Sequence, residues 1–516
     1  MKKPAAILIL LLLFSCNSRE QSPPQSPRKG EESPPQSPQR EGEGLNGAAE
    51  LALNPLYGQL YDAYEQYREG TIGDRRFKHE DILPLLRRLK PPFEVSQAGQ
   101  SIEGRSINLV RLGSGPRTVL LWSQMHGDEA TATMALMDIF NFLGASDAFD
   151  AFRQAILSEL TLYFIPMLNP DGAEKFQRRN ALDIDLNRDA LRLVTPEAEL
   201  LKRVRDETRA QWGFNLHDQN AYYGVGNDPK TASISFLAPA YNIDKEINEV
   251  RGNAMRLIVL LDRLLQQYIP GKVAKYDDTF EPRAFGDNIQ KWGTSTILIE
   301  SGGLDGDPEK QELRKLHFTA LLTAFDAIAS GSYRSANIQD YEKIPFNNSN
   351  AFHDLIIREA QVEKNGKWYT VDLGFRLSEI EYNDYQNHYH RASLSDIGDL
   401  STFYAYEQLD ARGYQVVPGK TYPSSFAGID DLRRQNIPAL LRQGYTTFQL
   451  IKLPPRSKWA ELPIEATEAG RAPANEIRLN GNPSFLLEKD GQYHYAVING
   501  YLYDLNNDQG IKERMR

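Results

Sequence analysis

Short apolar runs alternate with longer amphipathic segments between about residue 48 and residue 332. The runs have the length of buried strands, and they cover residues 118–124, 160–167, 214–216 and 295–299. The segments between them carry apolar residues at helical spacing, and they cover residues 130–143, 196–212, 244–268 and 308–329. Strands separated by helices are typical of a sheet that is covered on both faces. We therefore predict an α/β domain over residues 48–332, with a mostly parallel or mixed sheet and helices on both faces.

The alternation stops beyond residue 332, and the turn signals of β-hairpins take its place. Asn-Gly and Asp-Gly pairs favour tight hairpin turns, and here they separate segments of strand character. The pairs are at 365–366, 490–491 and 499–500, the expected strands lie within 355–373 and 485–503, and some helix is expected near 429–442. These patterns predict a β-rich accessory domain over residues 333–516.

The first 16 residues have the pattern of a bacterial secretion signal. Lys2 and Lys3 precede an apolar run over residues 5–14, which is too short to span a bilayer. The run ends at Ser15-Cys16 and resembles a bacterial lipobox, in which the Cys becomes the lipidated first residue of the mature chain. We predict a lipoprotein signal peptide over residues 1–16 with lipidation at Cys16. A plain signal peptide with an incidental Cys is the alternative.

Residues 17–47 form a low-complexity segment that is rich in Pro, Ser and Glu. A segment with so few apolar residues cannot bury a core, and its prolines favour extended conformers. We predict a disordered tether, and a Pro-rich motif that binds a partner is the alternative. With a lipid at Cys16, the tether would hold the protein on the membrane of the bacterial cell envelope, facing the periplasm or the cell surface.

Composition and charge exclude several classes of protein. The chain has 516 residues with 59 Lys and Arg against 69 Asp and Glu, a formal net charge of −10. Such a charge argues against a nucleic-acid partner, because phosphate binding requires a positive field. The chain has one Cys, so an intramolecular disulfide and a Cys-based zinc cage are excluded.

Four chemically active side chains follow the predicted strands. His126 and Glu129 come after the first strand, His217 ends the third and Glu300 ends the last. Ligands bind at the carboxyl ends of the strands in such sheets, so these side chains are expected at one edge. Two His and one Glu with a free fourth position are typical of catalytic zinc, although a lone His-x-x-Glu also occurs as a helix-capping Glu beside a surface His.

A longer set of motifs in fixed order supports the zinc interpretation. It consists of Gly104-Arg105, His126-Gly-Asp-Glu129, Asn169-Pro-Asp-Gly172, Arg178, Asp185-Leu-Asn-Arg188, Asn215-Leu-His217 and Glu300. The set resembles the zinc carboxypeptidase family of metallopeptidases, peptidase family M14. Each motif is common by itself, whereas the ordered set is specific.

The resemblance implies a role for each motif. His126, Glu129 and His217 would hold one Zn²⁺ per chain, and Asp185 would accept a hydrogen bond from the first histidine. Glu300 would be the general base that takes a proton from water. Arg178 would stabilise the oxyanion, and its spacing to the Asp-Leu-Asn-Arg motif favours it over its neighbour at position 179.

The resemblance also implies a substrate-binding side of the site. Asn187 and Arg188 would bind the terminal carboxylate of the substrate, because a guanidinium forms two hydrogen bonds with a carboxylate. Tyr276 is the candidate for the tyrosine that caps the substrate, and the pair Tyr222-Tyr223 is the alternative. The segment Ser301-Gly-Gly303 departs from relatives that carry an Arg after the base, so the preferred terminal residue is not predicted.

These features together predict a zinc-dependent metallocarboxypeptidase that hydrolyses a C-terminal peptide bond by means of zinc-activated water and a Glu base. Its expected partners are a peptide or cell-wall peptide substrate and, through the lipid anchor, a membrane. Two alternatives stay open at this point, namely a cell-wall peptide amidase of the same fold and a non-catalytic lipoprotein that binds peptide or glycan. His388 and His390 share one strand face, where a solvated pair is expected ahead of a metal site.

Overall fold

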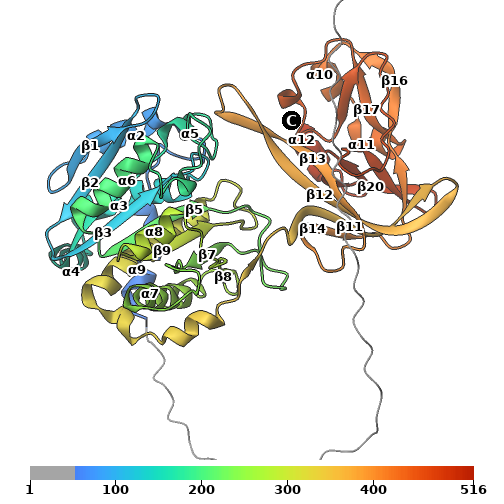
Figure 1. Ribbon diagram of the computed structural model, residues 1–516. Helices are drawn as coiled ribbons and strands as arrows, with labels where there is room; N and C mark the ends of the chain where they lie inside the picture. Colours follow the sequence, from blue (N-terminus) through green and yellow to red (C-terminus); the bar gives the residue numbers. More distant parts are fainter. Residues whose placement is uncertain (1–52, 516) are drawn as a thin grey trace, which may run out of the picture. The chain divides into compact units, whose positions relative to one another are not determined.

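A mixed sheet of eight strands forms the centre of the first part of the chain in the computed structural model, which describes residues 53–515 (Figure 1). The spatial order is β1 (Glu94–Gln100), β2 (Ser106–Gly113), β4 (Leu160–Ile165), β3 (Arg117–Ser123), β5 (Trp212–Asp218), β9 (Ser295–Ser301), β7 (Ile234–Leu237) and β8 (Val273–Lys275). The adjacent pairs β4–β3, β3–β5, β5–β9 and β7–β8 are parallel. The pairs β1–β2, β2–β4 and β7–β9 are antiparallel. The predicted α/β class with a mixed sheet is confirmed.

Helices cover both faces of this sheet because its central strands are apolar on both sides. In β3, Val119 and Leu121 join one core cluster, whereas Leu120 and Trp122 join the other. The first cluster lies under α3 (Thr131–Gly144), α7 (Glu249–Leu265) and α9 (Gln311–Ser330), with α1 (Leu56–Asp62) and α4 (Asp150–Glu159) beside α9. The second lies under α6 (Pro196–Thr208) and α8 (Phe285–Lys291).

Three of the predicted helices are shorter than their apolar patterns suggest, and local backbone chemistry explains each end. Helix α6 ends at Thr208 because Arg209 has a positive φ of 49°, which leaves Trp212 free to begin β5. Helix α7 begins after Asn248, whose side chain accepts a hydrogen bond from the backbone N–H of Arg251 at 2.9 Å. Helix α9 begins at Gln311. The Asp307 carboxylate accepts hydrogen bonds from the first three backbone N–H groups of this helix, at residues 311–313.

The second part of the chain is rich in β-structure, as predicted. Its larger sheet contains β11 (Phe352–Lys364), β12 (Lys367–Tyr382), β13 (Asn387–Gly398), β14 (Tyr404–Asp410), β15 (Gln415–Pro418), β19 (Phe485–Lys489), β20 (Gln492–Ile498) and β21 (Tyr501–Asp504). A smaller sheet contains β16 (Lys420–Phe426), β17 (Tyr445–Leu450) and β18 (Glu465–Glu468), accompanied by α10 (Ile429–Arg433), α11 (Ile437–Arg442) and α12 (Gln509–Met515). The predicted turn pairs at 365–366, 490–491 and 499–500 all have positive φ, as tight hairpin turns require.

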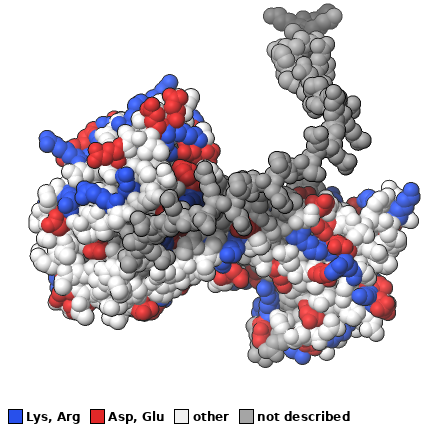
Figure 2. All heavy atoms as spheres, turned by 90° about the horizontal axis from the view of Figure 1, so that it is seen from below, with Lys and Arg blue, Asp and Glu red and all other residues white. Residues whose placement is uncertain are grey.

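The predicted domain boundaries stay a prediction. Tyr333, Tyr341 and Ile344 are buried in the first core cluster, in and just after the short 3₁₀ helices Ser332–Ser335 and Ile338–Lys343. The predicted signal peptide, with Cys16, and the predicted tether lie outside the described residues. Among residues 53–515, no helix is both long enough and apolar enough to cross a membrane. On the face drawn in Figure 2, basic and acidic side chains are intermixed.

A buried ion pair ties the first residues of the described chain to two long helices. Arg314 on α9 donates to both oxygens of Asp138 on α3, with Nε–Oδ2 at 2.6 Å and Nη2–Oδ1 at 2.5 Å, and neither side chain is exposed. The same guanidinium donates to the backbone oxygens of Glu69 and Ile72, and Tyr64 donates its hydroxyl to the carboxylate. The pair is therefore fully hydrogen-bonded, as burial of two charges requires.

Removal of one partner should destabilise the fold strongly. We expect Asp138→Ala to lower the free energy of unfolding by about 3–5 kcal/mol, because it leaves the Arg314 guanidinium buried without a counter-charge. Asp206→Ala, which removes a half-exposed ion pair on α6, should cost less than about 1 kcal/mol. Urea-induced unfolding measures both values, and equal losses in the two variants would contradict this assignment.

Candidate active site

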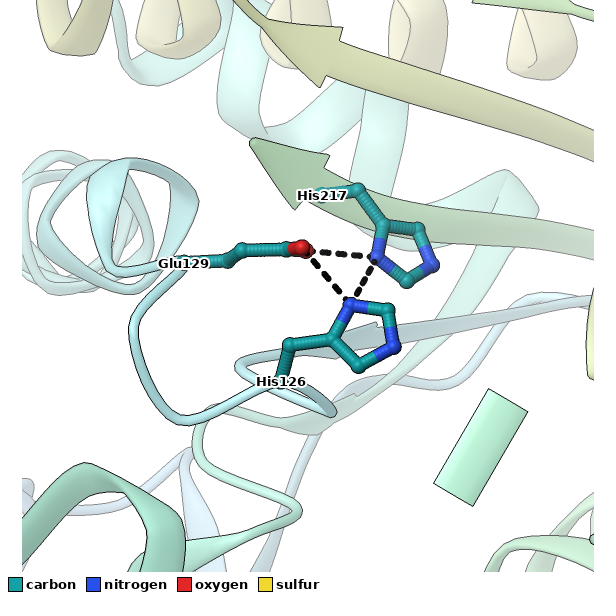
Figure 3. Close-up of side chains that lie close together, drawn as sticks. All are labelled: His126, Glu129 and His217. Carbon is teal, nitrogen blue, oxygen red and sulfur yellow. Dashed lines mark hydrogen bonds and ion pairs between the residues drawn. The ribbon is translucent and has the colours of Figure 1, made fainter. Parts of the chain in front are cut away.

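The carboxyl ends of three adjacent parallel strands bring the predicted ligands and base together. His217 lies near the end of β5, and in the parallel register it pairs with Glu300 near the end of β9. His126 and Glu129 follow β3, which is the other neighbour of β5. Residues that are far apart in the sequence therefore meet at one edge of the sheet, and Figure 3 shows three of them pointing toward a common centre.

His126, Glu129 and His217 form a compact cluster of ligand atoms. Glu129 Oε1 lies 2.7 Å from His126 Nδ1, Glu129 Oε2 lies 2.7 Å from His217 Nδ1, and the two Nδ1 atoms are 3.2 Å apart. All three side chains are buried. Two imidazoles and one carboxylate are a donor set that suits zinc, and the trio could hold one metal ion.

The ionisation of these side chains also fits a bound cation. Burial opposes charge on these groups, yet Glu129 and Asp185 raise the pKa of His126 to about 9, and the two histidines lower the pKa of Glu129. Burial lowers the pKa of His217, so this ring favours its neutral form, which is the form that binds metal. Its Nε2 atom is buried without a hydrogen-bond partner among the described residues.

Asp185 organises three neighbours through one carboxylate. Its Oδ1 lies 3.1 Å from His126 Nε2 and accepts from the backbone N–H of Asn187 at 2.9 Å. Its Oδ2 accepts from Arg178 Nε and Nη2 at 3.1 and 2.9 Å. Burial opposes its charge, but His126 and Arg178 lower its pKa below the ordinary range. The carboxylate thus fixes the imidazole whose other nitrogen faces the metal-ligand cluster.

Close packing of two glycine-containing loops holds the first histidine in place. A Cβ on Gly127 would lie 2.0 Å from the backbone carbon of Gly172, so a side chain there would force the loops apart. Asn169 caps the short helix α5 (Pro170–Glu174) by accepting from the Gly172 N–H. Asp171 accepts from Arg105 Nη1 at 2.7 Å. The Gly-Arg and Asn-Pro-Asp-Gly motifs therefore build the support of the site and do not line it.

Arg178 and Arg179 have different hydrogen-bond partners. Arg178 Nη1 lies 3.0 Å from His126 Nδ1 and 3.4 Å from Glu129 Oε1, so its guanidinium borders the metal-ligand cluster. Arg179 instead donates to the backbone oxygen of Asp183. The structure thus brings Arg178 to the site, while its role at the oxyanion stays a prediction.

The remaining predicted residues line one cavity of about 310 Å³ with the metal-ligand cluster. Arg188 is partly exposed there, with its Nε 3.5 Å from Glu281 Oε2, and Asn187 accepts from the backbone N–H of Phe285. Tyr276 stacks on Tyr223, with ring centroids 6.0 Å apart. Glu300 lines this cavity as well, and desolvation together with the charge of Glu129 raises its pKa. Both Tyr276 and Tyr223 line the cavity.

Asp218 and Lys310 support the site, and no role was predicted for either from the sequence. Asp218 follows His217, and its Oδ2 accepts from Lys310 Nζ at 3.1 Å and from Thr131 Oγ1 at 2.6 Å. The same ammonium donates to the backbone oxygen of Ser301 at 2.8 Å. Lys310 therefore ties together the residues that directly follow His217 and Glu300. The position of Asp218 next to a ligand was the available sequence signal.

The second histidine pair lies beside an acid that the sequence did not reveal. Glu379 on β12 is close to His388 and His390 on β13, and one ligand atom from each lies within 4.8 Å of the others. The Glu379 carboxylate, however, accepts from Arg75 and Arg76. Two guanidinium groups next to the carboxylate repel a cation. Both histidines are half-buried, and their interpretation as a solvated pair stays a prediction.

Comparisons with known proteins find similarity to carboxypeptidases. "Carboxypeptidase 2" of Trichophyton rubrum is 25% identical over 194 residues, which cover 35% of this chain and 35% of that protein. "Carboxypeptidase SOL1" of Arabidopsis thaliana is 28% identical over 174 residues, 28% of this chain and 35% of that protein. The chain thus spans about a third of the length of these relatives.

A solved structure of a metallo-carboxypeptidase from Burkholderia cenocepacia matches 49% of this chain and 69% of its own, with 17% identity and a TM-score of 0.40. The model of one protein family, described as zinc carboxypeptidase, matches residues 80–223. This segment carries His126, Glu129 and His217. The resemblance that the ordered motifs predicted is confirmed, and the matched part of the chain is similar to the zinc carboxypeptidases.

Proposed function

We propose that the protein is a zinc-dependent metallocarboxypeptidase. The observation that carries this proposal is the shared cavity, in which the His–Glu–His cluster, an adjacent carboxylate and a guanidinium line one space of about 310 Å³. A peptide that presents its terminal carboxylate to Arg188 would place its last peptide bond near the His–Glu–His cluster. The family resemblance over residues 80–223 supports a peptide hydrolase.

The side chains of this cavity divide the work of hydrolysis. A zinc ion held by the cluster would act as a Lewis acid, which polarises the scissile carbonyl and lowers the pKa of water. Glu300 accepts a proton from the attacking water and returns it to the leaving nitrogen, a task that suits a carboxylate with a raised pKa. The Arg178 guanidinium donates to the developing oxyanion. Asn187 and Arg188 fix the carboxylate end of the substrate.

Carboxylate recognition favours an exopeptidase over an endopeptidase or an amidase of the same fold. Arg188 directly follows Asn187, whose backbone N–H is bound by the carboxylate that also holds His126. The guanidinium lines the same cavity as the metal-ligand cluster, so a carboxylate bound to it would lie in that cavity. This geometry supports cleavage of the last peptide bond.

Substitutions can distinguish the role of the general base from that of the metal ligands. Glu300→Gln preserves shape but cannot accept a proton, so we expect normal zinc content and at least ~10²-fold lower kcat. His217→Ala should lose zinc and activity together, because one of the three ligands is removed. Metal analysis measures the zinc content of the two variants, and release of free amino acids from peptides measures their activity. Activity within a few-fold of wild type in Glu300→Gln would show that another group is the base.

Recognition of the substrate terminus can be tested with matched peptides. We expect amidation of the C-terminus to lower kcat/KM at least ~10-fold, because Arg188 then lacks its charged partner. Arg188→Met should lower activity on the free acid and narrow this difference, with unchanged zinc content. Arg192→Met, an exposed arginine on the same segment, is the control and should behave as wild type. Equal cleavage of acid and amide by the wild-type protein would exclude carboxylate anchoring.

We also propose that a lipid on Cys16 anchors the enzyme in the bacterial cell envelope. The apolar run that ends at Ser15-Cys16 supports this proposal, and Cys16 is the only Cys of the chain. Cys16→Ser should therefore abolish incorporation of labelled fatty acid and release the protein from the membrane fraction. Peptidase activity should be retained. Labelling that persists in this variant would contradict lipidation at Cys16.

A further inference from the structure

A second cavity, of about 600 Å³, adjoins the metal-ligand cluster. We call it the upstream cavity. Glu129, Asp218, Gln219 and Asn220 line both this cavity and the smaller one, so the two spaces meet at these residues. Asn187 and Arg188 line only the smaller cavity. A peptide whose carboxylate lies at Arg188 would therefore extend its preceding residues from the metal-ligand cluster into the upstream cavity.

The β-rich part of the chain supplies one wall of the upstream cavity. Leu377 and Glu379 on β12 and Tyr406 on β14 line it opposite residues of the α/β part. Tyr406 donates its hydroxyl to the backbone oxygen of Ala221 at 2.7 Å, close to the end of β5. Further contacts join the two walls, including Arg75 Nη2 to Glu379 Oε1 at 2.5 Å. The wall is thus held against the loop that follows His217.

The glycines after the base explain how this wall approaches so closely. A Cβ on Gly303 would lie 2.0 Å from the Tyr406 hydroxyl oxygen and 2.7 Å from the backbone oxygen of Ala221. A larger residue at position 303 would therefore push the β-rich wall away. The segment Ser301-Gly-Gly303 departs from relatives that carry an Arg there. Its Gly303 leaves the space that Tyr406 of the β-rich wall occupies.

The charges that line the upstream cavity are mainly negative. Glu379 is compensated by Arg75 and Arg76, whereas Asp305 is exposed and no ion pair to it is found among the described residues. Asp218 pairs with Lys310 through Oδ2 only. Its Oδ1 is buried without a hydrogen-bond partner among the described residues, and the side chain is 7% exposed. The cavity thus offers carboxylate oxygens to a donor that the chain itself does not supply.

The two cavities differ in the charged side chains that they do not share. Arg178 and Arg188 line only the smaller cavity, Asp305 lines only the upstream cavity, and Asp218 lies where the two meet. A substrate with a carboxylate at one end and an ammonium or guanidinium group before the scissile bond is complementary to both cavities. Such complementarity acts mainly on specificity and on the rate of association.

We infer that the upstream cavity selects peptides with a cationic group upstream of the scissile bond. The group is either a Lys or Arg side chain or the free amino terminus of a short peptide. The inference rests on the proposed peptidase function for the direction of the substrate. It adds a specificity that neither the His–Glu–His cluster nor the carboxylate-binding residues provide.

A peptide series tests the charge preference. The series is acetyl-Gly-X-Leu with X as Lys, Gln or Glu, together with unblocked Gln-Leu, whose only upstream cation is its amino terminus. We expect kcat/KM for Lys to exceed Gln by at least ~5-fold and Glu to be lowest, with the differences reduced by salt. A kcat/KM for Gln-Leu as high as that for the Lys peptide would show that the amino terminus can supply the cationic group. Equal rates for all four peptides would overturn the inference.

Substitution of the exposed carboxylate locates the effect. Asp305→Asn should reduce the Lys-to-Gln ratio several-fold and leave the rate for the Gln peptide unchanged, and Asp305→Lys should invert the preference between Lys and Glu. Asp244→Asn removes an exposed carboxylate that does not line the cavity, so it serves as the matched control. A Lys preference that survives both substitutions at position 305 would place the recognition elsewhere.

Binding without turnover separates this inference from the proposed function. The full-length Glu300→Gln protein should bind the Lys peptide more tightly than the Gln peptide by calorimetry, by a factor that falls in the double variant with Asp305→Asn. Lys-selective binding with no cleavage by wild type would contradict the peptidase and retain the cavity assignment. Cleavage without Lys selectivity would contradict the cavity assignment alone, and the absence of both would contradict both.

Discussion

Placement of three ionisable side chains in a buried cluster is the constraint on which the site depends. His126, Glu129 and His217 come from two strand ends, and the parallel pairing of β3 with β5 is what brings them within hydrogen-bonding distance. Burial opposes charge, so the surrounding groups must compensate it. Asp185 does so on one side by accepting from His126 and Arg178 with a single carboxylate.

Support for the cluster extends into the second layer of side chains and into the backbone. Lys310 bonds both Asp218 and the backbone of Ser301, so one ammonium holds the ends of β5 and β9 together. Ser301 also bonds His317, and burial lowers the pKa of this histidine to about 4, which keeps the ring neutral. The two strands that carry a ligand and the base are thus fixed relative to each other.

The β-rich part of the chain is connected to this site by contacts near the same strand ends. The hydroxyl of Tyr222, which lies five residues after His217, donates to Asp354 on β11 at 2.5 Å. Tyr406 packs over Gly303, three residues after Glu300. An accessory region attached in this way can influence which substrates reach the metal-ligand cluster, because its side chains border the approach to it.

The order of motifs and the apolar periodicity determined the α/β class, the hairpin turns and the candidate ligands, because each depends on local spacing along the chain. Sequence alone did not reveal β1, β2, β7 and β8, whose short or half-exposed patterns are weak. Only the tertiary structure decided which strands are neighbours, that Glu379 lies beside His388 and His390, and that Tyr406 requires a glycine at position 303. These facts depend on contacts between residues far apart in the sequence, and no local pattern encodes such contacts.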